Sequence, residues 1–204
     1  MSVEEEAQSK LEKAHELKSL GNELFKAGKF NKARVKYATA LAYTRGLPGR
    51  EMKGGESMAQ LAAQSQGGVK LSVELSEQLD DLDAIVKTNI STCFLKANKP
   101  SDALQAAREA LEIKPSHWKA KLRVAEAKEK LRDFDSCLAA LDDVSNHAEA
   151  AGDSGAMTLV RKLRDLANKG IKEEASRQRK AFSNIFERAR VEETSLRIPS
   201  DTTK

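Results

Sequence analysis

The sequence has few aromatic residues and no long hydrophobic run. Aromatic side chains make up 4% of its 204 residues, whereas charged side chains make up 32%. Sheet proteins are enriched in aromatic and β-branched residues, so this shortage favours an all-helical chain. No window of the sequence approaches eighteen uninterrupted apolar residues, and we therefore expect no membrane span.

Cysteine is also scarce, because Cys93 and Cys137 are the only two in the chain. Two cysteines do not make a disulfide framework. Each lies among apolar positions of a predicted helix, which indicates a buried, reduced thiol. The N-terminus, MSVEEEAQSK, is acidic and has no apolar core, so we expect neither a secretory signal nor a transit peptide. These features predict a cytoplasmic protein, with the nucleus as the alternative.

The usual signatures of catalysis and metal binding are missing from the sequence. His15, His117 and His147 share no metal-ligand spacing, and the cysteines are far from them in sequence. No Ser-His-Asp, Cys-His or G-x-G-x-x-G pattern stands in a suitable context. Acids mostly alternate with bases along the predicted helices, which is typical of a solvated face. We expect no enzyme, no cofactor and no metal site.

An internal repeat is the strongest positive feature. Residues 84–115 match the stretch around and after Trp118 at a constant shift of 34 residues, with small or apolar residues at each matched position. The matched pairs are Ile90 with Val124, Ser91 with Ala125, Ala103 with Cys137, Ala107 with Leu141 and Ala110 with Val144. A period of 34 is that of the tetratricopeptide repeat (TPR), in which each unit is two antiparallel helices.

The first unit carries the same pattern but stands out of phase. Leu20 precedes Ile90 by 70 residues, so Gly21 takes the repeat position of Ser91 and Ala125. Glycine in a helix interior costs about 1 kcal/mol relative to alanine. We interpret Gly21 as a small residue that lets paired helices approach closely. The excess length falls in a stretch rich in Gly, Ser and Gln, which is typical of a flexible insert.

These patterns predict an all-α fold, an α-solenoid of three TPR helix pairs followed by a long capping helix. Leu159, Leu163 and Leu166 are expected to cover the end of the third repeat, and Ser101 and Ser116 are expected to be N-caps. The expected organisation is an acidic tail (1–9), TPR 1 (10–47), a flexible insert (48–71), TPR 2 with an extended first helix (72–115), TPR 3 (116–151), a long basic helix (156–193) and a disordered tail (194–204).

The first helix of each pair should line a concave groove. The residues expected to face it, off the packing positions, are three cations and two amides: Lys18, Asn22, Asn89, Lys119 and Arg123. Arginine grips a carboxylate bidentately, lysine supplies a point charge, and asparagine donates without charge. Taken singly, each cation is explained as well by a solvated helix face, but five such residues in phase predict a carboxylate-binding site. Phe25 is expected either to form a groove wall or to be buried between helices.

Three stretches resemble a known family: LKSLGNELFKAGKFNKARVKYATAL, KTNISTCFLK and HWKAKLRVAEA. They are similar to the carboxylate-clamp TPR domains of cytosolic co-chaperones, over about residues 10–150 without the insert. That family binds the M-E-E-V-D or I-E-E-V-D ends of the ninety- and seventy-kilodalton heat-shock chaperones. Its clamp has Lys and Asn on the first helix, Asn on the third, and Lys and Arg on the fifth. All five positions match here, which implies a non-catalytic co-chaperone or adaptor.

Two further stretches carry resemblances. RKAFSNIFERARVEE resembles the last helix of the large immunophilins of the FK506-binding type, and the insert after YTRGLPG resembles small stand-alone TPR proteins with an interrupted first repeat. Too few residues precede the first repeat helix for a prolyl isomerase domain, so we expect no isomerase activity. Lys128 stands where the repeat usually has an apolar or aromatic residue, and Glu149 where it usually closes with proline.

The basic stretch from Arg161 to Arg190 leaves three interpretations open. It is a solvated helix, or it binds calmodulin or another acidic partner because Phe182, Ile185 and Phe186 accompany its cations, or it contacts RNA or an anionic membrane. The sequence has no aromatic stacking pattern of a single-strand binder, so nucleic acid is not expected. The alternative function is a TPR scaffold that binds another protein segment mainly through this helix.

Overall fold

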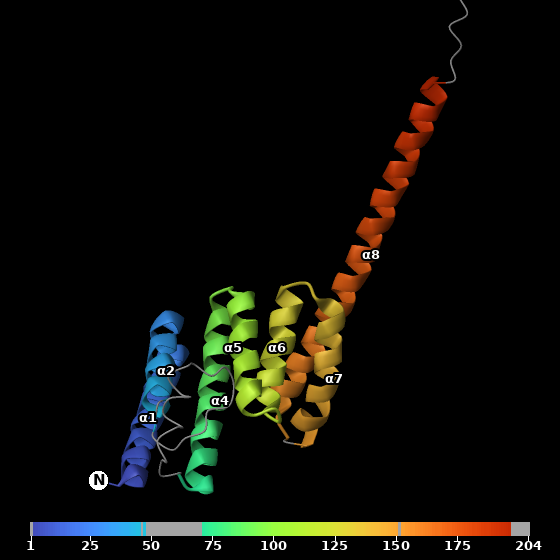
Figure 1. Cartoon of the computed structure of the whole chain (residues 1–204). Helices are drawn as coiled ribbons and strands as arrows, with labels where there is room; N and C mark the ends of the chain where they lie inside the picture. The colour runs from blue at the N-terminus through green and yellow to red at the C-terminus, as the bar shows by residue number, and fades with distance from the viewer. Residues whose placement is uncertain (1, 46, 48–70, 151, 197–204) are drawn as a thin grey trace, which may run out of the picture.

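The computed structural model describes residues 2–45, 47, 71–150 and 152–196, without the side chains of 148–150 and 192–196. This part of the chain is helical, as predicted, and its helices stand side by side in an antiparallel row (Figure 1). They are α1 (Val3–Lys26), α2 (Phe30–Thr44), α4 (Val73–Lys96), α5 (Pro100–Ile113), α6 (Trp118–Lys130), α7 (Phe134–Ala150) and α8 (Ser154–Leu196). None of the described helices is long and apolar enough to cross a membrane.

The helices pack as three consecutive pairs, α1 with α2, α4 with α5, and α6 with α7. Each second helix also contacts the first helix of the next pair, and α7 contacts α8 in the same way. The first helices α1, α4 and α6 contact one another in succession, whereas in the described part of the chain α2, α5 and α7 do not. First helices therefore line the inner side of a solenoid, which confirms the predicted fold class.

The 34-residue register defines the core of the second and third repeats. The matched positions of the second helices are fully buried in both repeats: Ala103, Ala107 and Ala110 on α5, and Cys137, Leu141 and Val144 on α7. The two cysteines are buried free thiols, as predicted. Burial raises the pKa of both thiols to about 11, so they stay protonated and unreactive near neutral pH.

Gly21 has the packing role that its repeat position predicts. A Cβ atom built on Gly21 would lie 2.5 Å from Cε1 of Tyr37, because the ring of Tyr37 lies directly against the α1 backbone. The equivalent Ser91 and Ala125 are fully buried as well. The hydroxyl of Ser91 donates to the carbonyl oxygen of Ala103 at 2.7 Å, so this buried hydroxyl has a hydrogen-bond partner.

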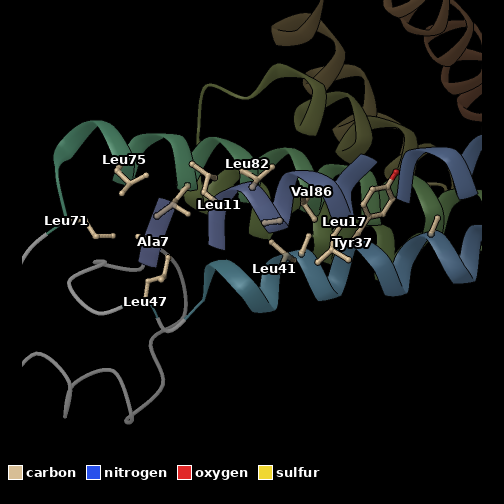
Figure 2. Close-up of a cluster of buried hydrophobic side chains, with 14 of the residues drawn as sticks. Ala7, Leu11, Leu17, Tyr37, Leu41, Leu47, Leu71, Leu75, Leu82 and Val86 are labelled. Atoms are coloured by element: carbon tan, nitrogen blue, oxygen red, sulfur yellow. The ribbon is translucent and has the colours of Figure 1, made fainter. Parts of the chain in front are cut away.

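The largest hydrophobic cluster joins the first repeat to the second. Figure 2 shows Leu11 and Leu17 of α1, Leu41 of α2 and Leu82 of α4 meeting in one cluster. Polar contacts join the same helices, because Thr44 donates to a carboxylate oxygen of Asp83 at 2.6 Å in the buried α2–α4 contact. The solenoid is therefore continuous from α2 to α4 even though residues 48–70 of the expected insert (48–71) lie outside the described part. Leu71, the last residue of that range, is instead buried in this cluster.

Helix α1 begins earlier than the sequence predicts. The side chain of Ser2 accepts from the backbone N–H of Glu5, and the carboxylate of Glu5 accepts from the backbone N–H of Ser2, which makes a capping box. Ala7 is fully buried within this extension. Residues 3–9 are thus the first turns of α1, and the expected separate acidic tail is wrong at this point.

The predicted caps of α5 and α6 are also wrong. Helix α5 begins at Pro100, with Lys99 as its N-cap, and α6 begins after His117. Proline fits the first helical turn because its φ is preset and it has no N–H to satisfy, so it starts the helix before Ser101. Ser116 lies outside α6 and does not cap it.

One turn conformation recurs at the end of each first helix. Gly28, Asn98 and Arg132 occupy equivalent repeat positions and have positive φ angles of 73°, 55° and 64°. Each turn closes with the same backbone bonds, from the residue itself to the carbonyl three residues back and from the next residue to the carbonyl five residues back. Only Gly28 adopts this conformation without a side-chain penalty.

Helix α8 caps the third repeat with its first half. Val160, Leu163 and Ala167 are buried against α7, and Leu159 is partly buried there. Leu166, which the sequence predicts on this face, is instead 39% exposed, because the buried stripe follows residues 156, 160, 163 and 167. The C-terminal half of α8 stands away from the other helices (Figure 1). Residues 197–204 lie outside the described part.

We predict that Gly21→Ala destabilises the protein even though alanine is the better helix former. The added methyl group must displace the Tyr37 ring, and overpacking of this kind costs about 1 to 3 kcal/mol of unfolding free energy. Denaturant unfolding followed by circular dichroism measures the loss. Gly155→Ala is the matched control, since its Cβ would meet only Asp153 Oδ1 at 3.5 Å. Equal stability changes in the two variants would contradict the packing role of Gly21.

Candidate functional site

A pocket of about 200 Å³ opens between the first two repeats. Its wall is built from α1, α2 and α4, and its lining residues are Asn22, Phe25, Lys26, Tyr37, Asn89 and Thr92. Three of the six residues predicted from the sequence, namely Asn22, Asn89 and Phe25, therefore lie together. Lys26, Tyr37 and Thr92 were not predicted to take part. Phe25 packs edge-on against Phe30, with the ring centroids 5.2 Å apart, so it is fixed at the pocket wall.

The side chain of Asn22 is oriented by its neighbours. The hydroxyl of Tyr37 donates to Asn22 Oδ1 at 2.7 Å, and Asn89 Nδ2 approaches the same oxygen at 3.4 Å. Both contacts end on the carbonyl oxygen, so the Nδ2 group of Asn22 is the part that these bonds do not use. Burial raises the pKa of Tyr37 to about 12, which keeps its hydroxyl protonated as a donor at physiological pH.

Lys18 stands one turn before Asn22 on the same helix. Its Nζ lies 3.3 Å from Nδ1 of His15. Burial lowers the pKa of His15, and the positive charge of Lys18 lowers it further, so the imidazole is neutral near pH 7. A neutral His15 accepts from the ammonium group and leaves the charge of Lys18 uncompensated at this contact.

Lys119 and Arg123 lie on α6, the next first helix, and are not part of the pocket wall. Arg123 Nη1 is 2.5 Å from Glu126 Oε2, and the side chains are only 22% and 18% exposed. Lys119 Nζ is 3.8 Å from Asp153 Oδ2 in the α7–α8 connection and lies 5.2 Å from the centre of the Trp118 ring. Two of the three predicted cations thus have carboxylate partners within the chain, which the sequence analysis did not foresee.

The repeat register contains the signal that would have found two of the missed residues. Thr92 and Glu126 occupy the same repeat position as Asn22, so the three side chains follow one another on α1, α4 and α6.

Joint recognition of a carboxylate by all five predicted residues stays a prediction. In the part of the chain that the structure describes, no group of three His, Cys, Asp or Glu residues could hold a metal ion.

A second surface lies on the projecting half of α8. We call it the basic segment, residues 177–190. Phe182, Ile185 and Phe186 are 62%, 61% and 72% exposed there. Their spacing places them on one side of the helix, and Arg177, Arg179 and Lys180 precede them in the sequence. Apolar side chains of this size on a protruding helix are unusual for a face that only contacts water.

We predict that Tyr37→Phe lowers the unfolding free energy by about 1 kcal/mol, because the partly buried Asn22 oxygen loses its shorter hydrogen bond. The ring stays in place, so the packing on Gly21 should survive. Tyr43→Phe on the same helix is the matched control, since Tyr43 is 39% exposed. Denaturant titration of the two variants measures the difference. A Tyr37→Phe variant as stable as Tyr43→Phe would show that the bond to Asn22 contributes nothing.

Comparison with known sequences gives partial relatives. No protein-family model matches the chain. Human sperm-associated antigen 1 is 33% identical over 118 residues, which is 58% of this chain and 10% of that protein. The rat peptidyl-prolyl cis-trans isomerase FKBP4 is 28% identical over 200 residues, which is 94% of this chain and 36% of the isomerase. The chain thus spans well under two thirds of either relative.

Comparison with solved structures identifies the fold. The C-terminal TPR-containing domain of an FK506-binding protein from Plasmodium falciparum superposes with a TM-score of 0.63 at 19% identity, covering 83% of this chain and 95% of that one. The Hsp90 co-chaperone Cns1 from Saccharomyces cerevisiae gives 0.58 at 19% identity, covering 89% and 48%. The TPR2B domain of yeast Sti1, in a complex with pHsp70, gives 0.53 at 19% identity, covering 77% and 97%. The chain therefore has the fold of a tetratricopeptide-repeat domain.

Proposed function

We propose that this protein is a non-catalytic TPR adaptor whose groove binds the acidic C-terminal peptide of a heat-shock chaperone. The peptide ends M-E-E-V-D or I-E-E-V-D, and the ninety-kilodalton chaperone is the first candidate. One observation carries the proposal: two amides, Asn22 and Asn89, share a pocket between α1 and α4, and the next first helix presents Lys119 and Arg123 one turn apart. This set suits carboxylates and contains no group that would act on a bond.

The chemistry of such a peptide end fits these donors. A C-terminal aspartate carries two carboxylates close together, the main-chain terminus and the side chain. Arg123 can bind one of them bidentately, while Lys18 and Lys119 supply point charges and the asparagines supply neutral donors. Because the anchoring charges are partly exposed, affinity should be about micromolar and should fall with salt. Phe25 would form the wall for the valine or methionine of the peptide.

The comparisons support the proposal at the level of the fold and do not test the individual clamp residues. One similar structure is a complex of the Sti1 TPR2B domain with pHsp70, and another is named as an Hsp90 co-chaperone. At 19% identity, each of these similarities supports the fold alone. Isomerase activity is not proposed, because this chain spans about a third of FKBP4 and its sequence contains no catalytic constellation. The buried free cysteines suit a reducing compartment such as the cytosol.

A scaffold that binds another protein segment is the second candidate function. The observation that favours it is the basic segment of α8, in which Phe182 and Phe186 are more than half exposed beside several cations. An acidic partner, calmodulin among them, would match that charge. This function needs no free carboxylate at the end of the ligand, so one titration separates the two candidates.

We predict that a free-acid M-E-E-V-D peptide binds with about micromolar affinity and that its C-terminally amidated twin binds at least about tenfold more weakly. The amide lacks the terminal charge that the clamp would hold, and loss of one charge-assisted contact is worth about 1.4 kcal/mol or more. Isothermal titration calorimetry at two salt concentrations measures both peptides. Absence of binding by either peptide would reject the clamp and favour the scaffold.

We further predict that the double variant Lys119→Ala/Arg123→Ala binds the free-acid peptide more weakly by about 1 to 3 kcal/mol, with the fold intact. Arg161→Ala/Lys162→Ala is the matched control, because it removes the same two kinds of side chain from exposed positions on α8. The control should bind as the unmodified protein does. If both double variants lose the same affinity, the effect is one of net charge and the clamp positions carry no special role.

A further inference from the structure

We propose that Glu126 is a built-in competitor for the groove: its carboxylate occupies the guanidinium of Arg123, and a ligand must exchange its own carboxylate for that of Glu126. This inference rests on the function proposed above. Neither the sequence pattern nor the resemblance to clamp domains assigns a role to Glu126.

The geometry of the pair is the first argument. Arg123 Nη1 and Glu126 Oε2 are 2.5 Å apart on the same face of α6, and both side chains are mostly shielded from solvent. Shielding strengthens the attraction between the charges and protects it from salt. A guanidinium that already donates to a carboxylate offers fewer donors, in a fixed direction, to a second one. The site therefore presents a neutral ion pair where the clamp pattern alone would place a free cation.

The charge balance of the groove is the second argument. Under the proposed function, three cations, Lys18, Lys119 and Arg123, attract the acidic ligand. Two carboxylates of the chain are paired with two of them, Glu126 with Arg123 and Asp153 with Lys119. Around Lys119 and Arg123, the charge that an incoming peptide meets is thus lower than the five-residue pattern suggests, whereas Lys26 adds a cation at the pocket between α1 and α4. Since attraction of an acidic peptide depends on this charge, the two carboxylates weaken binding.

The two carboxylates are unequal competitors. Asp153 and Lys119 are 3.8 Å apart, and their side chains are 37% and 56% exposed, so water and salt screen the pair. Asp153 also caps α8, since its Oδ1 accepts from the backbone N–H of Ala156 at 2.9 Å. Glu126 forms the shorter and more shielded contact. Its effect on a ligand should be the larger of the two.

The repeat register is the third argument, because it places Glu126 in the groove. Glu126 occupies the repeat position of Asn22 and Thr92, and both of those residues line the pocket between α1 and α4. The same position on α6 therefore faces the continuation of that groove. A carboxylate there repels an acidic ligand directly as well as neutralising Arg123.

Glu126→Gln tests the proposal. The variant keeps the length of the side chain and one acceptor oxygen, but it replaces the other oxygen with an NH2 donor and removes the charge. We expect it to bind the free-acid M-E-E-V-D peptide about threefold to tenfold more tightly than the unmodified protein, as release of a partly exposed ion pair implies. Glu112→Gln is the matched control, because Glu112 is exposed on α5 and the change in net charge is the same. Calorimetric titration measures all three proteins, and circular dichroism checks the helix content.

A second pair of variants shows whether the gain acts through Arg123. In the background of Arg123→Ala, the step Glu126→Gln should raise the affinity less than it does when Arg123 is present. A double-mutant cycle measures this coupling and cancels any common effect on folding. Asp153→Asn, which preserves a capping side chain, should give a smaller gain than Glu126→Gln.

The outcomes separate the two proposals. If the unmodified protein prefers the acid to the amide but Glu126→Gln binds no more tightly, the competitor role is overturned and the adaptor function stands. A weaker Glu126→Gln variant also overturns it and makes Glu126 a positioning residue for Arg123. An equal gain in Glu112→Gln reduces the effect to net charge and overturns it too. If the unmodified protein and Glu126→Gln both fail to distinguish acid from amide, both proposals fail.

Discussion

The close approach of α1 and α2 at Gly21 is the contact on which the rest of the candidate site depends. With no side chain at Gly21, the ring of Tyr37 lies on the α1 backbone. That position brings the Tyr37 hydroxyl to 2.7 Å from Asn22 Oδ1, and Asn89 of α4 reaches the same oxygen. A packing requirement of the first repeat thus sets the orientation of an amide that lies between two repeats. Core and groove share the same three helices and are not independent.

Much of this fold could be predicted from spacing alone. The 34-residue period gives the helix pairs because each unit buries the same face against its neighbours, and the matched positions are buried as a result. The small residues at Gly21, Ser91 and Ala125 are informative for the same reason, since a solenoid must repeat its closest helix contact. The burial of Cys137 follows from its place in this register, and that of Cys93 from the apolar positions around it on α4.

Other features depend on contacts that no single-sequence pattern displays. Residues 3–9 read as an acidic tail, yet a capping box at Ser2 and burial of Ala7 extend α1 through them. Leu166 has helical spacing from Leu163, but the line of contact with α7 follows Val160 and Ala167 and leaves Leu166 exposed. The five clamp positions were found by phase, whereas the carboxylates beside them were not. The repeat register marks Glu126 as a groove position, but its contact with Arg123 and that of Asp153 with Lys119 are distances between side chains, which a residue pattern does not contain.

The length of α8 has a consequence for how many partners the protein can hold. An α-helix rises about 1.5 Å per residue, so the stretch from Gly170, where α8 still touches Phe134 of α7, to its end at Leu196 spans about 40 Å. That distance exceeds the width of two packed helices, which is about 20 Å at about 10 to 12 Å per helix. A partner bound to the basic segment of α8 would therefore not collide with a peptide bound in the groove. Under the proposed function, the projecting half of α8 would act as a spacer between a ligand in the groove and a partner on the basic segment.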